Sequence, residues 1–135
     1  MQPMNKKIKA KWLDALRNQN YSQTQGVLRD DKGFCCLGVL CDILEPEKWE
    51  VIGNGWDIFG EDGVLPKAIE LKLGLHTDNP SFIPTEELVH KLVKDDKLTG
   101  KWQKIIEKNG AIPLSVLNDA GYTFLEIADF IEEYL

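Results

Sequence analysis

Apolar residues return along much of this chain at intervals of three and four, the spacing that gives an α-helix one buried face. The pattern is clearest at the C-terminal end, where Thr123 and Glu126 also form the capping box that begins a helix. The face that this helix is expected to bury consists of Phe124, Ile127, Ala128, Ile131 and Leu135.

Further helices are predicted from the same spacing and from residues that begin or end helices. The nearly unbroken apolar stretch 34–44 predicts a buried helix that ends at Glu45-Pro46. Thr85 can cap a helix whose expected buried stripe is Leu88, Val89, Leu92 and Val93. The remaining helices are expected over 5–18, from Pro66 to Gly74, around 102–110 and, as a short helix or a turn, over 113–119.

One hairpin interrupts the helical pattern. Residues 49–52 and 56–59 flank Gly53-Asn54-Gly55, and Asn-Gly is the preferred pair for a tight hairpin turn. Short strands are also expected at 27–29 and 64–65, and a loop at 76–84. The sequence therefore predicts an α+β fold over residues 1–135, a single compact helix-rich domain of five to six helices with a small antiparallel β-hairpin sheet.

Length and charge narrow the classes of function. A chain of 135 residues can bury one core without disulfides or metal. No apolar run approaches the roughly 20 residues of a membrane span, and the start lacks the apolar core of a signal peptide. We therefore expect no membrane partner and a location in the cytoplasm of the host cell. The net charge of −6 argues against a partner made of duplex nucleic acid.

Charge is also uneven along the chain. Residues 1–20 carry a balance of +4, and residues 112–135 a balance of −5. We interpret these segments as two solvated helix faces that are neighbours in the fold. The alternative is a basic helix that meets an anion, or an acidic helix that mimics one.

The cysteines Cys35, Cys36 and Cys41 are too close and too few for a disulfide framework. We interpret them as small apolar core residues. The alternative is a nucleophile at a helix N-terminus, with His76 or His90 as its base. The spacing suits no metal site, and no phosphate-binding loop is present, so no cofactor is predicted.

The stretch from Arg17 to Arg29 is the most unusual part of the sequence, because it gathers amide and guanidinium groups before the buried helix. Such groups recognise bases, sugars and phosphates, and a phenol adds a stacking surface. The alternative is a polar loop whose side chains satisfy buried backbone. The candidate ligand-binding residues are Arg17, Tyr21, Gln23, Gln25, Arg29 and, near the far end, Asn118 and Asp119.

Several motifs resemble a family of small, uncharacterised proteins encoded by tailed phages and prophages. They are Phe34-Cys35-Cys36-Leu37-Gly38-Val39-Leu40-Cys41-Asp42 and the run from Leu117-Asn118-Asp119 through Gly121 and Phe124 to Ile127-Ala128-Asp129-x-Ile131-Glu132. The resemblance implies phage origin and expression in a bacterial cytosol, and it supplies no catalytic residue.

A small acidic phage protein with few motifs is expected to act by binding and not by catalysis. We expect it to counter host defence by sequestering a small anionic nucleotide-type signal. The alternatives are a protein–protein inhibitor of a host enzyme, such as a host defence protein, and a cysteine-dependent enzyme acting on a nucleotide or thioester. A homo-oligomer is expected as well, since symmetric interfaces create repeated pockets.

Overall fold

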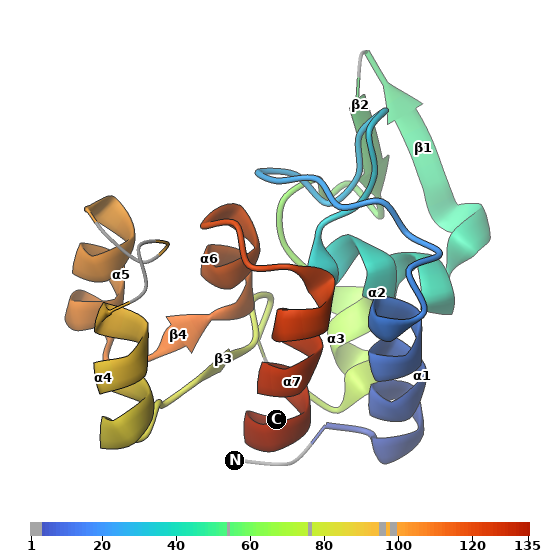
Figure 1. Cartoon of the computed structure of the whole chain (residues 1–135). Helices are drawn as coiled ribbons and strands as arrows, with labels where there is room; N and C mark the ends of the chain where they lie inside the picture. Colours follow the sequence, from blue (N-terminus) through green and yellow to red (C-terminus); the bar gives the residue numbers. More distant parts are fainter. Residues whose placement is uncertain (1–3, 54, 76, 95–96, 98–99) are drawn as a thin grey trace.

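The computed structural model describes residues 4–53, 55–75, 77–94, 97 and 100–135, and it confirms the α+β class (Figure 1). Helices dominate, and two short antiparallel ladders complete the fold. The helices are α1 (Lys6–Arg17), α2 (Cys36–Leu44), α3 (Lys67–Leu73), α4 (Glu86–Val93), α5 (Lys101–Asn109), α6 (Leu114–Asp119) and α7 (Phe124–Tyr134), with a short 3-10 turn, η1 (Pro46–Lys48).

Helix α2 lies at the centre of the core, where its residues 36–41 are all buried. Helix α1 packs against α2 and α7, and α6 packs against α2 from the other side (Figure 1). Trp12 of α1 is fully buried, and its indole nitrogen donates to the carbonyl of Cys36 at 2.9 Å. A buried indole N–H needs such a partner. The basic N-terminal helix and the acidic C-terminal helix are therefore neighbours, as the charge pattern predicted.

The predicted helix ends are confirmed where their side chains can be followed. The hydroxyl of Thr85 accepts from the backbone N–H of Leu88 at 3.2 Å, and Thr123 and Glu126 form the reciprocal capping box. Gly74 ends α3 with a φ of 75°, in the left-handed region that favours glycine at this position. These short-range signals fixed the helix boundaries to within a residue or two.

The hairpin is confirmed, and it projects from the helical body (Figure 1). Strand β1 (Trp49–Ile52) pairs with β2 (Gly55–Ile58), with Trp49 opposite Ile58 and Ile52 opposite Gly55. The predicted turn residue Asn54 lies outside the described residues. Strand β2 begins one residue earlier than predicted, because Gly55 joins the ladder, and it ends one residue earlier, so Phe59 lies in the turn beyond it.

Two of the other strand predictions are wrong. Residues 64–65 belong to no strand, and within 27–29 the structure gives only a single bridge, between Arg29 and Phe34. Strand β3 (Ser81–Phe82) pairs with β4 (Ile112–Pro113) in a ladder that was not predicted from the sequence. Part of the predicted 76–84 loop is thus a strand. Ladders of two residues are too short to produce a period in the sequence.

Helices α4 and α5 form a lobe beside the main body, which we call the α4–α5 lobe (Figure 1). The β3–β4 ladder connects it, and the ring of Phe82 stacks on that of Tyr134 in α7 with centroids 4.6 Å apart. Leu88 and Leu92 are buried as predicted, whereas Val89 is 40% exposed. The predicted buried stripe of α4 is therefore too wide. No helix within the described ranges is long and apolar enough to cross a membrane.

Candidate functional site

The segment 22–34 crosses the N-terminal end of α2 and is held there by Gln23 and Asn118. The amide nitrogen of Gln23 donates to the side-chain oxygen of Asn118 at 3.0 Å and to the carbonyl of Tyr122 at 2.8 Å. The same oxygen of Asn118 accepts from the backbone N–H of Cys36 at 3.1 Å. It thereby satisfies an N–H at the first turn of α2 that has no partner within the helix.

Asn118 is fully buried, and its side-chain nitrogen also bonds to the backbone. Its amide nitrogen donates to the carbonyl of Thr24 at 2.8 Å. Next to it, the carboxylate of Asp119 accepts from the backbone N–H of Gly26 at 2.8 Å. Of the predicted ligand-binding residues, Gln23, Asn118 and Asp119 therefore meet in space, and their bonds join the chain to itself. For these three residues the structure favours the alternative of a polar loop that satisfies its own backbone.

Arg17 lies apart from this network, on the surface between α1 and α7. Its guanidinium nitrogens lie 2.8 Å from Asp129 and 2.5 Å from Glu132. The hydrogen bonds that the guanidinium donates to Asp129 and Glu132 raise the pKa of Arg17 above its ordinary value. The predicted cluster is therefore not a single site, because Arg17 ties the basic helix to the acidic one.

Tyr21, which lies between α1 and α2 in the sequence, forms a hydrogen bond to a side chain of α2. Its hydroxyl donates to Asp42 at 2.7 Å, and the indole nitrogen of Trp49 donates to the other oxygen of the same carboxylate at 3.0 Å. Burial and the neighbouring Asp42 raise the pKa of Tyr21 to about 12. Asp42 thus holds both Tyr21, the residue before the 22–34 segment, and the hairpin residue Trp49 against α2.

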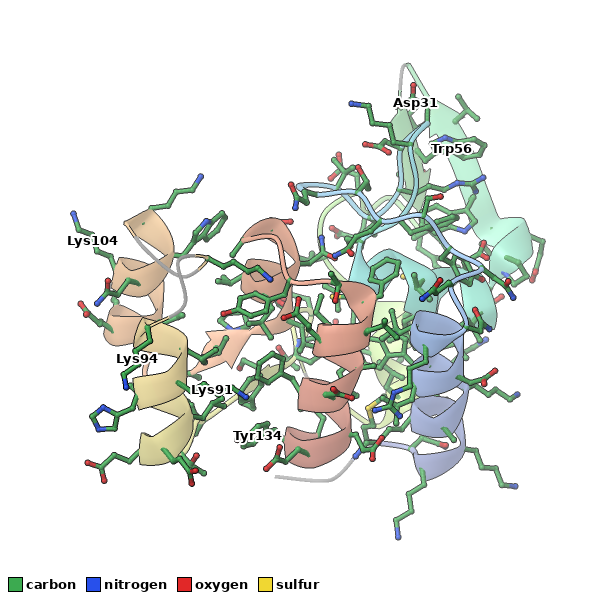
Figure 2. The ribbon with its side chains drawn as sticks, in the orientation of Figure 1. Asp31, Trp56, Lys91, Lys94, Lys104 and Tyr134 are labelled. Atoms are coloured by element: carbon green, nitrogen blue, oxygen red, sulfur yellow. The ribbon has the colours of Figure 1, made fainter. Side chains whose placement is uncertain are left out.

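Arg29 lies among aromatic rings at the base of the hairpin. Its guanidinium carbon is 3.7 Å from the ring centroid of Trp56, 5.0 Å from that of Phe34 and 5.4 Å from that of Trp49. Each distance is within the range of a cation–π contact. Figure 2 labels Trp56 on the upper part of the hairpin, near Asp31. We call Arg29, Phe34, Trp49 and Trp56 the aromatic cluster.

A groove of about 460 Å³ opens beside the aromatic cluster, between the hairpin and the loops 25–30 and 60–62. Gln25, Arg29 and Trp56 line it, so two of the predicted ligand-binding residues do reach an open concavity. Its other charged lining residues are Asp30, Asp57 and Asp62. One carboxylate oxygen of Asp57 is buried and has no hydrogen-bond partner within the described part of the chain. We call this concavity the hairpin groove.

Apolar side chains are exposed on the hairpin above the groove. Val51 is 62% exposed, Ile52 57% and Phe59 45%. Phe59 also has a φ of 51°, in the left-handed region that a bulky residue rarely adopts. Sequence reasoning missed these residues. The available signal was the pair Val51-Ile52, because adjacent residues of a strand point to opposite faces and a hairpin cannot bury both.

The thiols are buried in the core. Cys36 and Cys41 are fully buried and Cys35 is 6% exposed. Burial raises the pKa of Cys35 to about 11 and those of Cys36 and Cys41 further still. The thiolate that a nucleophile requires is therefore scarce at neutral pH. Of the two candidate bases, His90 is exposed on α4, and His76 lies outside the described residues. Among the residues described, no group of three acidic, histidine or cysteine side chains could hold a metal ion.

The fold and the site together describe a small α+β protein with a projecting hairpin and a groove at its base. The chain belongs to a family described as a domain of unknown function, DUF8296, whose profile matches residues 4–135. No curated protein and no solved structure is significantly similar to it.

Proposed function

We propose that this chain is a non-catalytic binding protein that docks on a partner protein through its hairpin. The observation that carries the proposal is the exposure of Val51 and Ile52 on one projecting hairpin, with the exposed Phe59 in the turn that follows its second strand. A protein gains nothing in solution by exposing adjacent large apolar residues, and such patches mark contact surfaces. Of the functions expected from the sequence, inhibition of a host enzyme fits this surface best.

Phe59 supports the choice of the hairpin. A left-handed backbone at a residue other than glycine costs roughly 1–2 kcal/mol, and here the side chain that incurs it is exposed. The aromatic cluster and the bonds to Asp42 hold the hairpin base in place. A rigid base reduces the entropy lost on binding.

The groove indicates the chemistry of the partner. Three aspartates line it against the single cation Arg29, whose guanidinium already faces three rings. A partner that presents apolar side chains flanked by lysine or arginine would complement both the hairpin and the groove.

Pull-down from a bacterial lysate followed by calorimetry with the purified partner tests this proposal. Val51→Asp with Ile52→Asp should abolish binding. Leu71→Asp is the matched control, because Leu71 is 64% exposed but lies on α3. Partner binding that survives the hairpin double substitution, or that fails equally in Leu71→Asp, would reject the hairpin as the contact surface.

Capture of a small anionic nucleotide is the second candidate, and one observation favours it. Arg29 and Trp56 stack at 3.7 Å and both line a groove whose volume suits a small molecule. Calorimetry with cyclic dinucleotides and ADP-ribose should then give binding heat that Arg29→Gln removes. Absence of heat with all of these ligands would end this candidate. Phage origin and the host setting stay predictions.

A further inference from the structure

The α4–α5 lobe is a second region of positive charge. Residues 91–108 carry six lysines against three carboxylates, in a chain whose net charge is −6. The basic helix α1 differs from it, because α1 lies against the acidic helix α7 and Arg17 is paired there twice. Of the six lysines in residues 91–108, Lys97 is paired with Glu126 of α7 at 3.1 Å, so the positive charge that the lobe presents to solvent comes from the others.

Three of these lysines form a stripe along α5. Lys101, Lys104 and Lys108 are all exposed and follow the spacing i, i+3, i+7, which places them on one side of the helix over about 10 Å. Within the ranges that the structure describes, no carboxylate oxygen lies within 4.0 Å of their ammonium nitrogens. In Figure 2, Lys104 of α5 and Lys94, the residue that follows α4, both project from the side of the lobe that faces away from α7.

The indole of Trp102, which packs partly against the core, adjoins the stripe at Lys101. Trp102 is half-buried, and the ammonium nitrogen of Lys101 lies 4.5 Å from the centroid of its ring. Proteins that bind single-stranded nucleic acid combine these two features: cations that follow the backbone, and an aromatic ring on which a base stacks.

The type of cation also bears on the partner. All six positive side chains of residues 91–108 are lysines, while the two arginines of the chain lie elsewhere, at Arg17 and Arg29. Arginine forks bind carboxylates and phosphates with fixed, bidentate geometry, whereas lysine binds phosphate as a point charge. A stripe of lysines therefore suits a phosphate backbone that is held without fixed geometry, and competition with polyglutamate distinguishes it from an acidic protein.

We propose that the outer face of α5 binds single-stranded nucleic acid. Phosphates lie along Lys101, Lys104 and Lys108, and one base stacks on Trp102. The stripe occupies one face of one helix, and the rest of the chain is acidic. We therefore expect no binding to a duplex, which needs a broader positive surface. The hairpin takes no part in this contact, and the two surfaces act separately.

Fluorescence anisotropy with a labelled oligothymidylate tests the proposal. Three phosphate contacts predict that the logarithm of the affinity falls with the logarithm of salt concentration at a slope of about −2. Replacing Lys101, Lys104 and Lys108 by Gln should weaken binding at low salt by at least about tenfold and bring the slope near zero. Trp102→Leu should weaken binding several-fold and leave the slope unchanged.

The matched control replaces Lys6, Lys7 and Lys11 of α1 by Gln, which removes the same charge from another exposed helix face. This control should bind as the unmodified chain does. Equal losses in both triple variants would mean that net charge alone matters, and would overturn the assignment. So would failure to bind the oligonucleotide, or displacement of it by polyglutamate at equal charge concentration, which would indicate an acidic protein as the partner. Circular dichroism verifies that each variant is folded.

Discussion

The side chain of Gln23 donates to that of Asn118 at 3.0 Å, across 95 residues of sequence. Asn118 in turn bonds the backbone of Cys36 and of Thr24. One buried amide therefore joins three segments of the chain: the 22–34 crossing, the first turn of α2 and the end of α6. Gln23 and Asn118 were predicted to bind a ligand. In the structure they instead hold three segments of the chain together.

Asn118→Ala should accordingly lower stability strongly. The substitution leaves the N–H of Cys36 and the carbonyl of Thr24 without partners in a buried site, at a cost of about 2–3 kcal/mol. We expect a fall in melting temperature of roughly 10 °C by circular dichroism. Gln25→Ala removes an exposed amide and is the control. If Asn118→Ala has the same melting temperature as the unmodified chain, the hydrogen bonds of Asn118 contribute little to stability.

Gly38→Ala should be at least as damaging, for a steric reason. A Cβ at Gly38 would lie 1.8 Å from the carbonyl oxygen of Leu28, which the backbone cannot easily move because it also accepts from the N–H of Cys35. Overpacking of this kind costs about 3 kcal/mol or more. Gly63→Ala, which meets nothing within 4 Å, should change the urea midpoint little. Similar midpoints for the two variants would contradict the close contact.

Tyr21 should make stability depend on pH in alkaline solution. Its pKa is raised to about 12 in the folded chain, against about 10 in an unfolded one. Its contribution to the free energy of unfolding is therefore complete below pH 10 and is lost as the pH rises towards 12.

Absorbance titration of the phenols measures this directly. One titration near pH 12 should disappear in Tyr21→Phe. The urea midpoint of Tyr21→Phe should also fall less between pH 9 and pH 11 than that of the unmodified chain. Identical pH profiles would argue against the bond to Asp42.

The three thiols should react slowly while the chain is folded. Since all are buried and their pKa values are raised, modification by an aromatic disulfide reagent at pH 8 should be about a hundredfold slower in buffer than in urea. A single thiol that reacts as fast in the folded chain as in urea would restore the possibility of a cysteine nucleophile.

The sequence by itself determined the local structure. Helix starts at Thr85 and Thr123, the helix end at Gly74 and the hairpin around Gly53 all follow from bonds or backbone angles within a few residues, which the local sequence carries in full. It failed at the β3–β4 ladder and at Val89, where the outcome depends on what another segment provides.

Tertiary structure alone decided the roles of the polar residues. Gln23 and Gln25 are the same residue type two positions apart, yet one bonds Asn118 and the other lines an open groove. Arg17 and Arg29 differ in the same way, because one meets two carboxylates and the other three rings. An amide or a guanidinium can bind its own chain or a ligand equally well, and which of these it does depends on partners that lie far away in sequence and that only the fold brings near.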